Sequence, residues 1–214
     1  MKSTWFFDLD GTLADTDPDI RASWKAALKD LALSCPSFDR EFVAGPTLED
    51  MAKKLFPDIY TEELGARIRA QFARRYDACG FPHTREYVGV RDMLSLLKRR
   101  GARLAIVTNK RYEGAKAIAA KFGWMEFFEK LYAADMFAPG PRLDKTRLMA
   151  HAMEDMGVAP ADCVMLGDTS NDFAAARANG VACIAAAWGY GRDGELAAAS
   201  SVAASPADAI RLEP

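Results

Sequence analysis

Short apolar segments alternate with amphipathic segments from residue 104 onward, and this alternation constrains the fold more than any other feature. The apolar segments predict strands at residues 104–108, 131–133, 163–166 and 181–185. The segments between and after them predict helices at residues 112–122, 145–156, 172–178 and 206–212. Strands that are separated by helices form a parallel sheet covered on both faces. We therefore predict an α/β fold built on a doubly wound parallel sheet.

The N-terminal part of the chain contributes one more strand and then departs from the alternation. An aromatic run at residues 5–7 predicts the strand, and helical spacing of apolar residues follows it. Asp17 and Pro18 predict an N-cap and a first-turn proline, while Thr47 and Thr61 open later helices. This stretch reads as a separate helical bundle inserted after the first strand.

Turn-forming residues then return the chain to the α/β pattern. The segment at residues 80–83 contains Gly and Pro, and an amphipathic helix is predicted at residues 90–100. The predicted domains are an α/β core of residues 1–15 plus 84–214 and an inserted helical bundle of residues 16–83.

Composition narrows the class of partner and the compartment. The 214 residues carry 28 basic and 30 acidic side chains, a formal charge of −2, which argues against a nucleic-acid surface built on net charge. The four cysteines are far apart and match no zinc spacing, so we expect them to be reduced. No apolar leader or segment of transmembrane length is evident. We expect a cytoplasmic protein that binds neither nucleic acid nor membrane.

Two carboxylates stand at the end of the first predicted strand. Asp8 and Asp10 are two positions apart, so on an extended backbone they point to the same side. Two like charges this close are unfavourable unless a divalent cation or a shared proton compensates them.

The other strand ends carry polar residues of a matching kind. Ligands of such sheets bind outside the carboxyl ends of the strands, where these residues would converge. Carboxylates around Mg²⁺, with hydroxyl, amide and ammonium donors around an oxyanion, are what phosphoryl transfer requires. The set comprises Asp8, Asp10, Thr108, Asn109, Lys110, Lys145, Asp168 and Asp172.

In this order the motifs resemble those of the haloacid dehalogenase-like hydrolases, in particular the branch similar to phosphoglycolate phosphatases. The matching segments are Asp8-Leu9-Asp10-Gly11-Thr12-Leu13, Val107-Thr108-Asn109-Lys110, Lys145, and Gly167-Asp168 with Asp172. The resemblance spans essentially the whole chain and implies a Rossmann-like core, with the inserted helices as its cap.

The resemblance also implies roles for single residues. Asp8 would be the nucleophile that becomes a transient aspartyl-phosphate, and Asp10 the general acid–base. The implied magnesium ligands are Asp8, Asp10 through its backbone carbonyl, Asp168, and Asp172 either directly or through water. The implied phosphate-binding groups are Thr108, the amide of Asn109 and the ammonium of Lys145.

Some of these positions also have simpler interpretations. Residues 139–144 lack the Lys-Pro pair common before the lysine of the third motif, so Lys110 or Arg142 could replace Lys145. Thr108 and Asn109 could simply cap the helix predicted after them. Asp168 could likewise cap the next helix along, although a second carboxylate at Asp172 is not needed for a cap. His83 and His151 have no partner at ligand spacing and are predicted to be structural.

The leading functional hypothesis is a Mg²⁺-dependent phosphatase of a small phosphomonoester. Phosphoglycolate is the first substrate to expect and a nucleoside monophosphate the second. A phosphosugar mutase would use the same nucleophile, and a non-catalytic binding protein could keep the scaffold. Whether the chain is a monomer or a homodimer is left open by the pattern.

Overall fold

The computed structural model of the protein describes residues 3–212. These residues form two compact units, one comprising the chain up to Asp15 and from Arg85 onward, the other comprising Thr16–Thr84. We call them the α/β unit and the helical unit.

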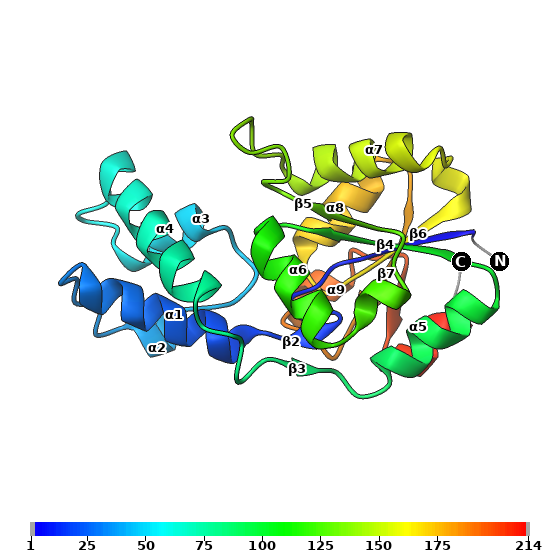
Figure 1. Cartoon of the computed structure of the whole chain (residues 1–214), viewed down its shortest axis with the longest axis horizontal. Helices are drawn as coiled ribbons and strands as arrows, with labels where there is room; N and C mark the ends of the chain where they lie inside the picture. Colours follow the sequence, from blue (N-terminus) through cyan, green and yellow to red (C-terminus); the bar gives the residue numbers. More distant parts are fainter. Residues whose placement is uncertain (1–2, 213–214) are drawn as a thin grey trace. The chain divides into compact units, whose positions relative to one another are not determined.

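The α/β unit is built on a six-stranded sheet with the order β5-β4-β1-β6-β7-β8 (Figure 1). All pairings in this sheet are parallel. The strands are β1 (Thr4–Phe7), β4 (Arg103–Thr108), β5 (Lys130–Ala133), β6 (Cys163–Gly167), β7 (Ala182–Ala186) and β8 (Ser201–Ala203). The predicted parallel α/β architecture is confirmed.

Helices cover both faces of this sheet, as the alternation requires. In Figure 1, α7 and α8 lie on one side of the sheet, and α5 and α6 lie on the other. The helices of this unit are α5 (Val90–Arg99), α6 (Tyr112–Lys121), α7 (Lys145–Met156), α8 (Ser170–Ala178), α9 (Asp193–Leu196) and α10 (Pro206–Arg211), with 3-10 turns η1 (Trp124–Glu126) and η2 (Pro160–Asp162).

The central position of β1 explains its aromatic sequence. Trp5 and Phe6 are fully buried because helices cover both faces and strands flank both edges. Phe7 pairs in register with Ile106 of β4 and with Leu166 of β6. The carboxyl ends of these three strands therefore lie side by side, and whatever follows each of them shares one edge of the sheet.

The helical unit contains α1 (Asp17–Asp30), α2 (Phe38–Glu41), α3 (Leu48–Leu55) and α4 (Glu62–Asp77). Thr47 and Thr61 cap α3 and α4 through bonds from the backbone amides of Asp50 and Leu64, at the predicted positions. The prediction that Asp17 is an N-cap is wrong, because Asp17 is the first helical residue and Thr16 holds the cap position.

The two chain segments that connect the units pair with each other within the α/β unit. They form an antiparallel ribbon of β2 (Ala14–Asp15) and β3 (Arg85–Glu86). Neither strand was predicted, and β8, α2 and α9 were also missed. All of these elements have five or fewer residues, too few to show a hydrophobic period.

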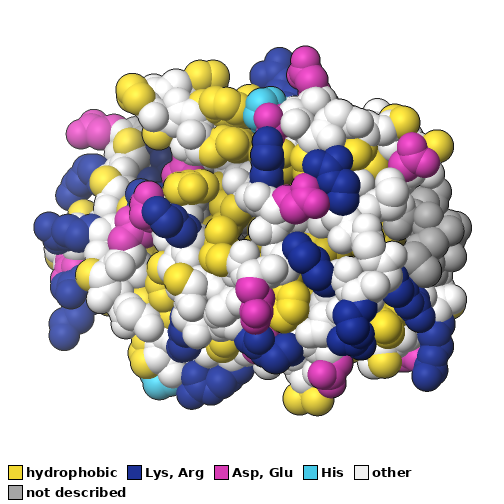
Figure 2. Space-filling view, turned by 45° about the vertical axis from the view of Figure 1, so that its right-hand side comes forward, with side chains coloured by type: hydrophobic (Ala, Val, Ile, Leu, Met, Phe, Trp, Pro, Cys, Tyr) yellow, Lys and Arg dark blue, Asp and Glu magenta, His cyan; other side chains and the backbone are white. Residues whose placement is uncertain are grey.

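The remaining sequence-level expectations concern cysteines, charge and hydropathy. All four cysteines are free, with Cys163 and Cys183 buried. On the face shown in Figure 2, basic side chains alternate with acidic and apolar ones. No helix within residues 3–212 has the length and apolar character needed to cross a membrane.

Candidate active site

Three carboxylates meet at the shared edge of the sheet. Asp8 follows β1, Asp168 follows β6, and Asp172 lies in the first turn of α8. One carboxylate oxygen from each lies within 4.8 Å of the others. Asp168 and Asp172 are fully buried and Asp8 is 7% exposed. We call this set the carboxylate cluster.

Two glycines leave room for the cluster. A Cβ atom on Gly11 would lie 2.1 Å from Asp168 Oδ2, and one on Gly167 would lie 2.3 Å from Asp172 Cγ. Gly11 also has φ of +81°, a conformation that other residues rarely adopt. The glycines of both motifs are therefore required by the close approach of the backbone to the two buried carboxylates.

Lys145 provides the cation of the cluster. Its side chain is 4% exposed, and its Nζ lies 2.9 Å from Asp8 Oδ1 and also forms an ion pair with Asp172. It opens α7, where Asp144 is the N-cap and accepts a hydrogen bond from the Arg147 amide at 2.9 Å. A cation in the first turn is opposed by the helix dipole, so its buried carboxylate partners account for its position.

Burial and neighbouring carboxylates oppose the ionisation of Asp8 and Asp168. Burial raises the pKa of Asp8 from its ordinary value of 3.8 to about 6, and Asp172 and Asp10 add to this while Lys145 opposes it. Burial, with Asp172 and Asp8, also raises the pKa of Asp168 well above the ordinary value. Burial alone would lower the pKa of Lys145, but the charges of Asp172 and Asp8 outweigh it and raise that pKa.

The chemistry of the cluster fits a divalent cation. Three carboxylates and one ammonium have a formal charge of −3 + 1 = −2 when all are ionised. Carboxylate oxygens are the ligands that Mg²⁺ prefers in proteins. Asp8, Asp168 and Asp172 each bring one such oxygen to the same buried place, so the three residues could hold one ion.

Asp10 pairs with a different cation from Asp8. Its Oδ1 accepts a bond of 2.7 Å from Nζ of Lys110, the residue two positions after the end of β4. Among the described residues, the set that could hold a metal through side chains is Asp8, Asp168 and Asp172, without the Asp10 carboxylate. The two aspartates of the first motif therefore face different lysines.

The residues predicted to hold phosphate lie at the end of β4. Thr108 is buried, and its Oγ1 accepts a bond of 3.2 Å from the Lys110 amide. The Asn109 carbonyl accepts a bond of 2.6 Å from the exposed Arg142 guanidinium. The helix that follows is α6, whose N-cap position is Arg111. Thr108 and Asn109 thus lie before the cap position and next to the strand ends that carry the cluster.

The cap of α8 and the carboxylate cluster share one residue, Asp172. Its N-cap is Thr169, not Asp168, and both the Thr169 amide and hydroxyl donate to Asp172 Oδ2 at 3.0 Å. The expectation that Asp172 is not needed for a cap is therefore wrong. Its Oδ1 is the oxygen paired with Lys145, so one carboxylate serves the helix and the cluster at once.

Asp168 is held by two groups that sequence reasoning did not assign. Oδ1 accepts from Thr12 Oγ1 at 3.0 Å, and Oδ2 accepts from the Tyr190 amide at 2.7 Å. The Tyr190 hydroxyl in turn donates to Asp15 of β2 at 2.8 Å. Thr12 belongs to the first motif and could have been suspected, whereas no pattern in the sequence pointed to Tyr190.

Both histidines have structural surroundings. The His83 amide donates to the buried Asp19 carboxylate at 3.0 Å, and the His151 ring makes edge contacts with Tyr132 and Phe137. Neither belongs to the carboxylate cluster.

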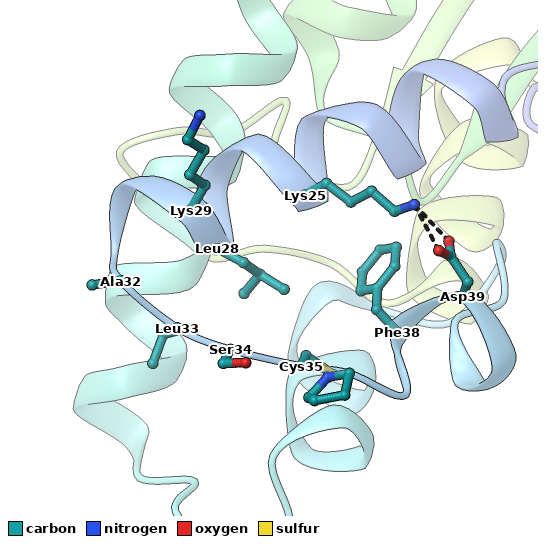
Figure 3. Close-up of a pocket in the computed structure, with 10 residues that line it drawn as sticks. Lys25, Leu28, Lys29, Ala32, Leu33, Ser34, Cys35, Phe38 and Asp39 are labelled. Atoms are coloured by element: carbon teal, nitrogen blue, oxygen red, sulfur yellow. Dashed lines mark hydrogen bonds and ion pairs between the residues drawn. The ribbon is translucent and has the colours of Figure 1, made fainter.

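The helical unit has a hollow of about 550 Å³ beside the C-terminal end of α1 (Figure 3). Lys25 lies at its rim and points to Asp39, with Nζ 2.6 Å from Oδ1. The residues that line it are Lys25, Leu28, Lys29, Ala32, Leu33, Ser34, Cys35, Pro36, Phe38 and Asp39. None of the predicted site residues is among them, because all of those residues belong to the α/β unit.

The family model described as haloacid dehalogenase-like hydrolase matches residues 5–186. The chain belongs to this family. A 5'-nucleotidase of Pseudomonas aeruginosa is 32% identical over 193 residues, which cover 90% of this chain and 86% of that protein. The tyrosine-protein kinase PtkA of Mycobacterium tuberculosis is 32% identical over 187 residues, which cover 87% of this chain and 62% of the kinase.

Solved structures show the same fold. The structure titled as a predicted phosphoglycolate phosphatase from Haemophilus somnus is 26% identical, has a TM-score of 0.82, and covers 99% of this chain and 98% of its own. These similarities confirm the family resemblance, the α/β fold and the assignment of the chain to the phosphoric monoester hydrolases.

Proposed function

We propose that the chain hydrolyses a small phosphomonoester with Mg²⁺ through an aspartyl-phosphate on Asp8. The observation that carries the proposal is the buried carboxylate cluster around Lys145 at the sheet edge. Structural ion pairs alone do not explain it, because three buried carboxylates with one ammonium are costly without a further cation. Asp8, Asp168 and Asp172 would hold Mg²⁺ through carboxylates, with the backbone carbonyl of Asp10 as the fourth protein ligand.

In the first step a carboxylate oxygen of Asp8 attacks phosphorus, and the bond from phosphorus to the ester oxygen breaks. Asp10, the other aspartate of the motif, gives its proton to that leaving oxygen. Thr108 and the Asn109 amide hold the phosphoryl oxygens, and Lys145 neutralises charge on them and on Asp8. Bound Mg²⁺ supplies further positive charge where negative charge develops.

In the second step water attacks phosphorus of the aspartyl-phosphate and gives its proton to Asp10. The bond between phosphorus and Asp8 breaks, which releases inorganic phosphate and restores both aspartates.

The α/β unit is the catalytic domain in this proposal, and the helical unit is the cap that selects the leaving group. The four free cysteines suit a reducing cytoplasm, which is the location we propose.

The substrate classes to test are phosphoglycolate and nucleoside monophosphates. Relatives with names of both kinds support them, a 5'-nucleotidase at 32% identity and a structure titled as a predicted phosphoglycolate phosphatase at 26%. A panel of phosphate esters with and without Mg²⁺ should release inorganic phosphate only with the metal. Phosphate release at an unchanged rate by Asp8→Asn would refute the proposal, and the exposed Asp92→Asn is the matched control.

Transfer of the phosphoryl group to a hydroxyl acceptor is the second candidate. The 32% identity to a protein named as a kinase favours it, and Asp8 would serve a phosphosugar mutase in the same way. Product analysis separates the cases, because a hydrolase releases one phosphate per ester consumed and a transferase returns the group to an acceptor. A binding protein without catalysis would release none while still binding phosphate esters.

A further inference from the structure

Lys110 is a buried cation that the proposed chemistry does not yet use. Its side chain is 4% exposed and its Nζ lies 2.7 Å from Asp10 Oδ1, across 100 residues of sequence. Asp10 is more open, with 20% of its side chain exposed. Lys145 occupies the equivalent place beside Asp8, at 2.9 Å. Each aspartate of the first motif is therefore paired with a different buried lysine.

The local backbone fixes Lys110 in this position. Its amide donates to the Thr108 hydroxyl at 3.2 Å, and the preceding carbonyl, of Asn109, accepts from Arg142 at 2.6 Å. Lys110 also precedes the N-terminus of α6, where the helix dipole disfavours a cation. An ion pair that buries an ammonium is seldom a net source of stability, because desolvation opposes the attraction of the charges. The pair therefore calls for a functional explanation.

The position of the Asp10 carboxylate suggests that explanation. Asp10 is only two residues from Asp8, so its carboxylate could turn toward a cation bound by the cluster. In the structure it pairs with Lys110 instead, and the cluster contains the side chains of Asp8, Asp168 and Asp172. An Asp10 carboxylate that ligated the cation could not exchange protons with the leaving group.

We propose that Lys110 is the positioning residue of Asp10, holding its carboxylate away from the metal cluster and available to the leaving oxygen. This inference rests on the proposed phosphatase function and assigns Lys110 a part in leaving-group departure. This positioning role of Lys110 differs from phosphate binding. We assign phosphate binding to Lys145, which pairs with Asp8 and Asp172.

The test compares substrates that need protonation of the leaving group with one that does not. In Lys110→Met, kcat/KM for an alkyl phosphate should fall about 100-fold or more, the usual contribution of general acid catalysis, and that for p-nitrophenyl phosphate should change less than about threefold. Turnover of the aryl ester should begin with a burst of one nitrophenol per enzyme, because Asp10 is still needed to hydrolyse the phosphoenzyme. Mg²⁺ affinity, measured by calorimetry without substrate, should not weaken.

Three further variants complete the test. Lys110→Arg keeps the cation and should restore most of the alkyl phosphatase activity. Asp10→Asn should reproduce the leaving-group dependence of Lys110→Met, and the double variant should lose little more than either single one, because both changes remove one function. Thermal unfolding of each variant with Mg²⁺ checks that the chain is folded.

An equal loss with alkyl and aryl esters would overturn the inference, as would a rise in KM for both with kcat unchanged, which is the pattern of a phosphate-binding lysine. Weakened Mg²⁺ binding in Lys110→Met would overturn it as well. If the proposed phosphatase function is itself wrong, the result is different. The unaltered enzyme would then release no phosphate, or the Asp8→Asn variant would keep the activity of the unaltered enzyme.

Discussion

Replacing Lys145 by Met should destabilise the metal-free protein and make its stability depend on Mg²⁺. The ammonium is 4% exposed, lies 2.9 Å from Asp8 and forms an ion pair with Asp172. Met has a similar length but no charge. The substitution therefore leaves the three carboxylates of the cluster within 4.8 Å of one another without their ammonium.

The size of the effect follows from the cost of a broken buried pair. Removing one partner of such a pair typically costs about 3–5 kcal/mol. For a domain of this length each 1 kcal/mol lowers the midpoint of thermal unfolding by about 2–4 °C, so a decrease of about 6–20 °C is expected without metal. The loss should be smaller near pH 5, because protons can neutralise Asp8, whose pKa burial raises to about 6.

Calorimetric thermal unfolding with chelator and with excess Mg²⁺ measures the metal-free stability and the stability that Mg²⁺ adds. A ligand at 100 times its dissociation constant adds about 2.7 kcal/mol of stability to the folded state, so Mg²⁺ should recover a large part of the loss. The exposed Lys116→Met, in α6, is the matched control and should unfold like the unaltered protein under both conditions. A metal-free midpoint of Lys145→Met within about 2 °C of the unaltered protein would refute the electrostatic reasoning.

Three other changes test separate parts of the structure. The metal-free protein should gain stability as pH falls through about 6 toward 3.8, because the folded state holds the Asp8 proton more tightly than the unfolded state. Mg²⁺ should accordingly stabilise the protein more at pH 8 than at pH 5.5, a difference that Asp8→Asn should diminish. Gly11→Ala should cost about 2–5 kcal/mol in denaturant unfolding and abolish Mg²⁺ binding, since the added Cβ would lie 2.1 Å from Asp168 Oδ2; normal metal affinity would contradict this. Asp19→Ala should cost about 2–4 kcal/mol, because the buried amide and hydroxyl of Thr84 each donate to Asp19 at 2.7 Å; an unchanged midpoint would show that water replaces the carboxylate.

The sequence sufficed to predict five of the six strands of the sheet, all but β8, and the edge at which the candidate site lies. Apolar strands of three to six residues separated by helices admit few topologies, and the aromatic run at residues 5–7 indicated one further strand. Asp8, Asp168 and Asp172 could be predicted to converge because each follows a strand of the same parallel sheet.

Interactions that depend on side-chain direction could not be predicted in this way. Lys110 and Lys145 were both plausible cations, and only the three-dimensional arrangement assigns one to Asp10 and the other to Asp8. The bond from the Tyr190 amide to Asp168 arises in a loop without a hydrophobic period, so no local pattern marks it. Short elements such as β2 and β3 are formed by pairing between distant segments, which a single sequence does not display.

During turnover Asp8 should carry the phosphoryl group. Asp10→Asn should accumulate this intermediate with p-nitrophenyl phosphate and Mg²⁺, because its formation needs no acid and its hydrolysis needs a base. Rapid quenching followed by peptide mass spectrometry should find one phosphoryl group on Asp8, sensitive to hydroxylamine and absent when Mg²⁺ is removed. Phosphate on another residue, or nitrophenol release without any phosphoenzyme, would contradict the account.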